Sequence, residues 1–175
     1  MAGPKEYLVV SSSLRTSSRS RILAEYLLEY YESQQVSCAF LDLRAFNLPL
    51  CDGEVAYGHP DVSKCAELIR GARVIIAATP VYNFDACAAL KNLIELTGDS
   101  WEDKVVGFLC AAGGSSSYMS VMSLANSLML DFRCLIIPRF VYATRNDFSD
   151  EEPAEEVKGR VARLAQASLA IKNAV

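Results

Sequence analysis

Residues 7–24, YLVVSSSLRTSSRSRILA, decide the fold of this chain. A continuous apolar run at residues 7–10 predicts a short strand that is buried on both faces, as strands of a parallel sheet are. Seven serine and threonine residues occupy the next ten positions, and an amphipathic pattern follows over residues 22–30. The stretch therefore predicts a strand, a hydroxyl-rich loop and a helix that begins near Ser18.

The loop at residues 11–20 has the chemistry of an anion site. A helix N-terminus presents unpaired backbone N–H groups and the positive end of the helix dipole. Hydroxyl groups and two arginines, Arg15 and Arg19, add further donors. A single serine would indicate only a helix cap, and a flexible polar loop would not explain the tight placement between strand and helix. Seven hydroxyl groups exceed what one cap requires, so we predict a phosphate site.

Length and composition indicate one ordinary globular domain over residues 1–175. The chain is 51% hydrophobic and 22% charged, and a domain of this size buries roughly 70% of its unfolded surface. The formal charge of −4 provides no basic excess for nucleic acid or a membrane surface. Neither a secretory signal nor a membrane-spanning apolar run is present in the sequence, so we expect a cytoplasmic protein.

The six cysteines and the single histidine do not indicate a metal or catalytic site. No C-x-x-C pair occurs, so we interpret the cysteines as mostly buried small hydrophobic residues. Cys38 and Arg44 have the C-x5-R spacing of phosphate-cleaving thiol enzymes, but bulky residues separate them where a phosphate loop needs glycines. His59 lies in a long connection at residues 45–60 without a partner, and we interpret it as a surface residue.

The remainder of the chain alternates strands with helices. Further strands are predicted at residues 36–43, 73–79, 104–112 and 134–142. Asp61 is predicted to cap the second helix and Asn83 or Asp85 the third, and two more helices are predicted to begin near Tyr118 and near residues 150–153. Pro80 is expected to stop the third strand, and Pro138 to place the fifth strand at an edge. Strict alternation implies right-handed crossovers and a parallel sheet with helices on both faces. We predict a flavodoxin-like three-layer α/β sandwich with five parallel strands in the order 2-1-3-4-5.

That strand order gathers three loops at one edge of the sheet. The loops are residues 11–20, the turn PVYNF at residues 80–84, and GGSSS at residues 113–117. Neither G-x-G-x-x-G nor G-x-x-x-x-G-K-[ST] occurs, so a dinucleotide fingerprint and a P-loop are not supported. A phosphate loop beside aromatic and glycine-bearing loops suits a mononucleotide with a flat ring, such as FMN.

Two motifs carry a resemblance to a known family. Residues 12–18 read SSLRTSS, residues 80–83 read PVYN, and residues 89–92 read ALKN. These segments are similar to the G-S-x-R-x-x-S loop, and to the P-E-Y-N loop followed by A-L-K-N, of the NADPH-dependent FMN reductase family. Ser12 replaces the usual glycine of this family, Val81 replaces its glutamate, and Phe84 and Asp85 replace small residues.

The resemblance implies an FMN oxidoreductase whose chemistry belongs to the flavin. Hydride would pass from NADPH or NADH to N5 of bound FMN, and electrons then to a quinone, azo compound, metal oxyanion or free flavin. No catalytic side chain is required. The resemblance implies Ser11, Ser13, Arg15, Ser18 and Ser20 around the phosphate; Pro80, Val81, Tyr82, Asn83 and Phe84 along the isoalloxazine; and Gly113, Gly114, Ser115 and Ser116 at its pyrimidine side. It also implies a homodimer or tetramer. A non-catalytic flavin carrier or regulatory protein is the alternative that the departures keep open.

Overall fold

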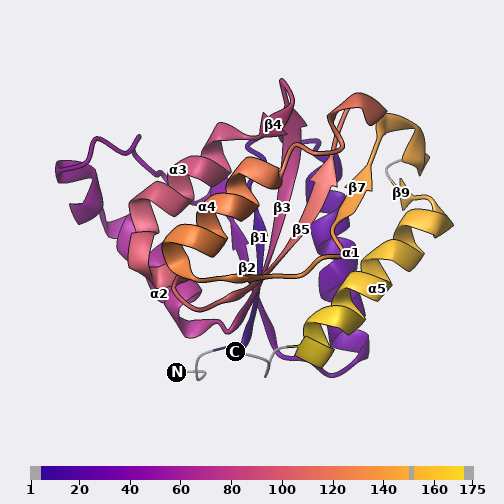
Figure 1. The fold of residues 1–175 in the computed structure, drawn as a ribbon, viewed down its shortest axis with the longest axis horizontal. Coiled ribbons are helices and arrows are strands. Elements are labelled where there is room, and N and C mark those ends of the chain that lie inside the picture. The colour runs from indigo at the N-terminus through magenta and orange to yellow at the C-terminus, as the bar shows by residue number, and fades with distance from the viewer. Residues whose placement is uncertain (1–4, 150–151, 172–175) are drawn as a thin grey trace.

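The computed structural model describes residues 5–149 and 152–171 (Figure 1). The strands are β1 (Tyr7–Ser11), β2 (Cys38–Asp42), β3 (Val74–Tyr82), β4 (Asp85–Ala86), β5 (Val105–Ala111), β6 (Leu135–Ile136), β7 (Val141–Ala143), β8 (Phe148–Ser149) and β9 (Glu152–Pro153). The helices are α1 (Arg19–Ser33), α2 (Pro60–Gly71), α3 (Ala88–Thr97), α4 (Met122–Phe132) and α5 (Glu155–Ile171). Short 3-10 turns are η1 (Leu43–Ala45), η2 (Val55–Gly58), η3 (Gly98–Trp101), η4 (Ser115–Ser117) and η5 (Arg145–Asp147).

The central sheet is parallel and has the order β2-β1-β3-β5, with β6 and β7 both paired to the outer side of β5. Val9 in β1 lies opposite Phe40 in β2 and Ile76 in β3, which fixes the register of the first three strands. The predicted order is confirmed, with the fifth strand broken into two pieces. β4 pairs antiparallel with the end of β3, and β8 and β9 form a separate two-stranded sheet.

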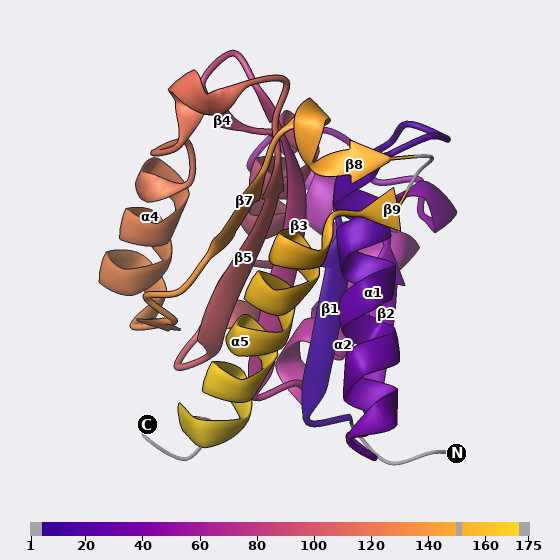
Figure 2. The ribbon, with the colours of Figure 1, turned by 90° about the vertical axis from the view of Figure 1, so that its right-hand side faces the viewer.

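Helices cover both faces of the sheet. Helices α2, α3 and α4 lie on one face, and α1 and α5 lie on the other (Figure 2). Successive residues of β1 alternate between the two cores: Leu8 and Val10 belong to the first, and Tyr7 and Val9 to the second. Because both sides of the strand are buried, the run is apolar throughout. The predicted three-layer architecture is confirmed.

The strand β3 continues through Pro80, so the prediction that this proline stops the strand is wrong. Ser12 N donates to Ala78 O at 3.0 Å, and β1 pairs with β3 no further than this point. Backbone polar groups two residues apart in a strand point to the same side, so the nitrogen of Pro80 faces the same side as Ala78 O. β1 no longer pairs with β3 at this level, and no ladder partner is present there among the described strands. The proline therefore removes no bond from the ladder.

Pro138 interrupts the last strand of the central sheet. It lies between β6 and β7, both of which pair with β5 alone among the described strands. The predicted edge position is therefore confirmed, and the proline accounts for the break because it cannot donate a ladder hydrogen bond.

The N-termini of α1 and α2 are capped by side chains. Arg21 N donates to Ser18 Oγ at 3.3 Å, which confirms the predicted start of α1. Helix α2 begins at Pro60, and its cap is His59, whose Nδ1 accepts a hydrogen bond from Asp61 N at 3.2 Å. The prediction that Asp61 caps this helix is wrong by two positions. His59 is half-buried and has a structural role.

Burial keeps four of the cysteine thiols protonated. It raises the pKa of Cys65 and Cys134 to about 11 and that of Cys38 and Cys110 to about 12, so these thiols are protonated at neutral pH. All six cysteines are free. Cys38 therefore lacks the reactive thiolate that a C-x5-R phosphate-cleaving site needs.

Candidate functional site

The loops that follow β1, β3, β5 and β7 gather at one edge of the sheet (Figure 2). A pocket of about 500 Å³ opens there, a volume within the usual range of about 300 to 1,000 Å³ for small-molecule sites. Its lining residues are Ser13, Arg15, Ser17, Ser18, Arg19, Ser20, Ile22, Pro80, Val81, Tyr82, Ala111, Ala112, Gly113, Arg145 and Phe148.

The loop after β1 carries unpaired backbone donors, and three of the residues concerned, Ser17, Arg19 and Ser20, line this pocket. Within residues 5–149 and 152–171, the amides of Thr16, Ser17, Arg19 and Ser20 donate no hydrogen bond. Arg19 and Ser20 form the first turn of α1, where the cap residue Ser18 satisfies only the amide of the third helical position. Free amides at a helix N-terminus favour binding of an anion.

The pocket is also electropositive. Arg15, Arg19 and Arg145 line it, and none of its lining residues is acidic. The guanidinium of Arg19 lies 5.9 Å from the ring centroid of Phe148, so this cation also packs against an aromatic wall. The local charge is opposite in sign to the formal charge of −4 on the whole chain. An anionic small molecule is therefore the favoured occupant.

A hydrogen-bonded turn holds Arg145 and Phe148 at the pocket. The backbone N and the hydroxyl of Thr144 donate to Asp147 Oδ2 at 2.6 and 2.7 Å. These two hydrogen bonds lower the pKa of Asp147. Arg145 and Phe148 were not among the residues predicted from sequence. The signal that was available is their position: they follow the last strand, whose carboxyl end lies at the same edge of the sheet as the others.

A tight hairpin joins β3 to β4 beside the pocket. Tyr82 pairs with Asp85, and the two residues between them, Asn83 and Phe84, have φ of 50° and 67°. Positive φ at both central positions is typical of a type I′ turn, which favours Asn-Gly. Asn tolerates the left-handed region well, whereas Phe does so at a cost. The ring of Phe84 is exposed at the tip.

The hairpin corrects the predicted cap of α3. Asn83 and Asp85 lie within the hairpin, and the residue that precedes α3 is Cys87, which makes no side-chain cap hydrogen bond. Asp85 instead accepts a hydrogen bond from Ser123 Oγ in α4 at 3.1 Å. This contact connects the hairpin to the helix that follows the glycine loop.

Ser12, which replaces the family's usual glycine, points away from the pocket. Its hydroxyl donates to Ala78 O at 2.9 Å and lies 3.2 Å from Cys87 Sγ, and the residue is fully buried. Its φ is not in the positive region, so the turn does not require glycine here. Thr79 Oγ1 accepts from Cys87 N at 3.2 Å in the same buried cluster. The serine at this position therefore leaves the pocket beside the loop unobstructed.

The glycine loop after β5 lies partly in the pocket lining. Gly113 lines the pocket, whereas Gly114, Ser115 and Ser116 are exposed outside its lining. The hydroxyl of Tyr142 donates to Gly114 O at 2.5 Å and so fixes the loop to β7.

The structure brings most of the predicted site residues to one pocket. Ser13, Arg15, Ser18, Ser20, Pro80, Val81, Tyr82 and Gly113 line it; Ser11, Asn83, Phe84, Gly114, Ser115 and Ser116 do not. Ser11 lies at the end of β1, and its buried hydroxyl has no hydrogen-bond partner among the described residues. Ser17 and Arg19, which belong to the loop predicted to bind an anion, also line the pocket, and Ile22, Ala111, Ala112, Arg145 and Phe148 line it without having been predicted.

The described ranges, residues 5–149 and 152–171, contain neither a metal-binding cluster nor a membrane-spanning helix. No group of three or more histidine, cysteine, aspartate or glutamate side chains there is placed to hold a metal ion. The helices in the same ranges are too short or too polar to cross a membrane.

A parallel sheet in this order, with helices on both faces and a hydroxyl-rich loop after its first strand, defines a flavodoxin-like protein. The amino-acid sequence places it more narrowly. The chain belongs to the NADPH-dependent FMN reductase family, whose family model matches residues 6–149. This membership confirms the resemblance predicted from the two loop motifs, and the family is one of oxidoreductases.

Similarity to known proteins supports this family membership. An NAD(P)H-dependent FAD/FMN reductase of Geobacillus thermodenitrificans is 30% identical over 135 residues, which cover 75% of this chain and 73% of the relative. An NADPH azoreductase of a Bacillus species is 26% identical over 153 residues, or 86% of this chain and 83% of the relative. The apo crystal structure of an NADH:FMN oxidoreductase has a TM-score of 0.79 at 15% identity and covers 94% of this chain and 88% of its own. That structural likeness supports the fold alone.

Proposed function

We propose that this chain binds FMN in the pocket at the carboxyl edge of the sheet and is an NAD(P)H-dependent FMN oxidoreductase. The acceptor class that we propose is a quinone, azo compound, metal oxyanion or free flavin. One observation carries the proposal: unpaired amides of the loop after β1 and three arginines surround a pocket that no acidic residue lines. This donor set fits a terminal phosphate monoester.

The proposed division of labour follows the three loops. The hydroxyls and amides of residues 11–20, with Arg15, would hold the phosphate. Residues 80–84 would lie along the isoalloxazine, where Pro80 and Val81 are buried and Tyr82 is half exposed at the rim. Gly113, Gly114, Ser115 and Ser116 would lie at its pyrimidine side. When bound, FMN supplies the hydride acceptance and the electron delivery, so the chain itself needs only to bind and orient.

Exposed apolar side chains in the hairpin and directly after the glycine loop support two further parts of the proposal. Tyr82, Phe84, Tyr118 and Met119 are each between 48% and 69% exposed. Such surface suits a nicotinamide ring or a second copy of the chain, and we propose a homodimer or tetramer in the cytoplasm. Sedimentation at micromolar concentration that finds only the 19.1 kDa species would contradict self-association.

The test is an FMN titration followed by anaerobic stopped-flow reduction with NADPH and with NADH. Substitution Arg15→Ala is expected to weaken FMN binding by about 1–3 kcal/mol, or roughly 5- to 150-fold in Kd, because a charge-assisted hydrogen bond to phosphate is lost. Riboflavin, which has no phosphate, is the matched control ligand, and its Kd should change by less than about twofold.

Two outcomes would contradict the proposal in different ways. Equal losses for FMN and riboflavin would move the phosphate site away from Arg15. If the protein saturated with FMN is reduced by neither NADPH nor NADH over minutes, the reductase function fails, and a flavin carrier or regulatory protein takes its place.

A further inference from the structure

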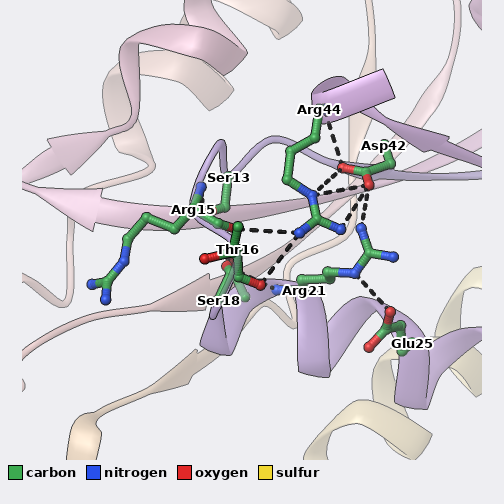
Figure 3. Close-up of polar contacts among 9 residues, drawn as sticks. Ser13, Arg15, Thr16, Ser18, Arg21, Glu25, Asp42 and Arg44 are labelled. Carbon is green, nitrogen blue, oxygen red and sulfur yellow. Dashed lines mark hydrogen bonds and ion pairs between the residues drawn. The ribbon is translucent and has the colours of Figure 1, made fainter. Parts of the chain in front are cut away.

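Arg44 contacts the loop after β1 from the side opposite to the Arg15 side chain, which lines the pocket (Figure 3). It lies in η1, directly after β2, and is not one of the pocket-lining residues. Its Nη1 donates to the backbone carbonyls of Arg15 and Thr16 at 3.4 and 3.3 Å. Figure 3 shows the side chain of Arg15 extending from the loop in the opposite direction, away from Arg44.

These two contacts determine where the loop's amides point. No peptide bond in the described residues is cis, and in a planar trans peptide the C=O and N–H groups point in opposite directions. Holding the carbonyls of Arg15 and Thr16 toward Arg44 therefore turns the N–H groups of Thr16 and Ser17 away from Arg44, toward the side on which the Arg15 side chain lies. These are two of the amides that make no hydrogen bond within the described chain.

An acidic residue holds Arg44 in this orientation. Asp42 Oδ2 accepts from Nη2 and Nε of Arg44 at 3.0 and 3.1 Å, and its Oδ1 accepts from Arg44 N at 3.2 Å. Asp42 also pairs with Arg21, whose Nε donates to Glu25 at 2.7 Å. Two arginines and two carboxylates thus make a formally neutral network. Its effect on a ligand must arise from geometry more than from net charge.

We propose that Arg44 is a positioning residue that pre-sets the phosphate loop and makes the pocket select FMN over phosphate-free flavins. This inference rests on the proposed function. Without Arg44, no other described group holds the carbonyls of Arg15 and Thr16. The loop would then become ordered only on binding. The entropy cost of this ordering would weaken the binding of FMN, whose phosphate contacts the loop, and would not affect riboflavin, which has no phosphate.

The test compares Arg44→Ala with the unaltered full chain by measuring Kd for FMN and for riboflavin. We expect the Kd of FMN to rise about tenfold and the Kd of riboflavin to change less than about twofold. The unchanged riboflavin affinity shows that the protein remains folded. Arg133→Ala is the matched control, because Arg133 pairs with Glu102 at 2.6 Å but does not contact the loop; its FMN affinity should stay unchanged.

Two further measurements separate positioning from simple charge. Arg44→Lys keeps the charge but lacks the planar fork that spans Asp42 and two carbonyls, so it should lose nearly as much FMN affinity as Arg44→Ala. The loss should persist between about 0.1 and 1 M salt, where the Debye length falls from about 10 to about 3 Å. Full recovery by Arg44→Lys, or disappearance of the loss in salt, would overturn the positioning role.

The outcomes distinguish this inference from the function on which it rests. If the unaltered protein does not bind FMN, the proposed function fails. If it binds FMN and Arg44→Ala keeps the same ratio of FMN to riboflavin affinity, only the role of Arg44 fails. Should Arg44→Ala not fold, Asp42→Asn, which leaves Arg44 in place but weakens its anchor, is expected to lower that ratio by a smaller factor; an unchanged ratio would overturn the proposal.

Discussion

The hairpin between β3 and β4 places a phenylalanine where glycine is preferred, and substitution Phe84→Gly should stabilise the protein. Phe84 occupies the second central position of a type I′ turn with φ of 67°. Its ring is 69% exposed, so it gains little from burial that could offset the backbone cost. The strain lies beside the pocket, which is where proteins tend to retain it.

The magnitude follows from three contributions. A residue with a Cβ costs about 1–2 kcal/mol in the left-handed region. Glycine offsets about 0.4–1 kcal/mol of this gain, because it increases the conformational entropy of the unfolded chain and so stabilises the unfolded state. Loss of a mostly exposed ring costs little. We therefore expect Phe84→Gly to raise the free energy of unfolding by about 0.8 kcal/mol, the difference between the midpoints of these two ranges. Phe84→Ala keeps the strained backbone and removes the ring, so its stability should equal or fall slightly below that of the unaltered protein.

Urea unfolding of flavin-free protein measures this difference. The single tryptophan, Trp101, is fully buried and reports the transition by fluorescence. Flavin must be removed because a ligand that binds only the folded state adds stability of its own. The decisive comparison is between the free energies of unfolding of Phe84→Gly and Phe84→Ala, because both variants lack the ring and differ only in the Cβ. If Phe84→Gly is no more stable than Phe84→Ala, the backbone at this position is not strained and the reasoning is refuted.

Two further predictions concern the core and the turn that carries Arg145. A Cβ at Gly107 would lie 2.8 Å from Ile76 Cδ1 in the closed core, so Gly107→Ala should lower the free energy of unfolding by about 1–3 kcal/mol. The control is Gly159→Ala in α5, where the nearest atom is 3.9 Å away, and this change should be neutral or stabilising. Equal effects of the two substitutions on the free energy of unfolding would contradict the argument. Hydrogen bonds from Thr144 lower the pKa of Asp147, so its contribution to stability is present above the unfolded pKa of about 3.9 and is lost as pH falls through the lower native pKa. Unfolding measured against pH should show Asp147→Asn less stable at neutral pH and equal to the unaltered protein in strong acid; a difference that persists in acid would exclude this cause.

The sheet could be predicted because its central strands are buried on both faces. Burial on both sides demands apolar residues without alternation, and residues 7–10, 73–79 and 104–112 show such runs. The alternation with helices then restricts the topology to very few arrangements. The effect of Pro80 was not predictable from composition, because it depends on where β1 stops pairing with β3.

The pocket could be predicted in part, and what was missed is long-range. The loop after β1 contains its own signal, since hydroxyls and arginines precede a helix. Arg145 and Phe148 carry no such local motif and reach the pocket only because β7 ends at the same edge as β1. Asn83 and Phe84 lie in the hairpin turn, outside the pocket lining, because β4 pairs antiparallel with the end of β3, and no local motif indicated that pairing. Local sequence thus indicates chemistry, whereas strand pairing determines which chemistry is brought together.

Ser12 shows how a departure from a family motif can strengthen the arrangement that the motif serves. A glycine there would keep the backbone bond from N to Ala78 O at 3.0 Å, but serine adds a second bond from its hydroxyl to the same carbonyl at 2.9 Å. Ala78 lies two residues before Pro80 in the strand that leads to the hairpin. The phosphate loop and the hairpin are therefore fixed to each other through buried contacts. For a ligand that contacts both loops, the relative positions of the loops are therefore set before binding. The free-energy cost of ordering the loops on binding is correspondingly smaller.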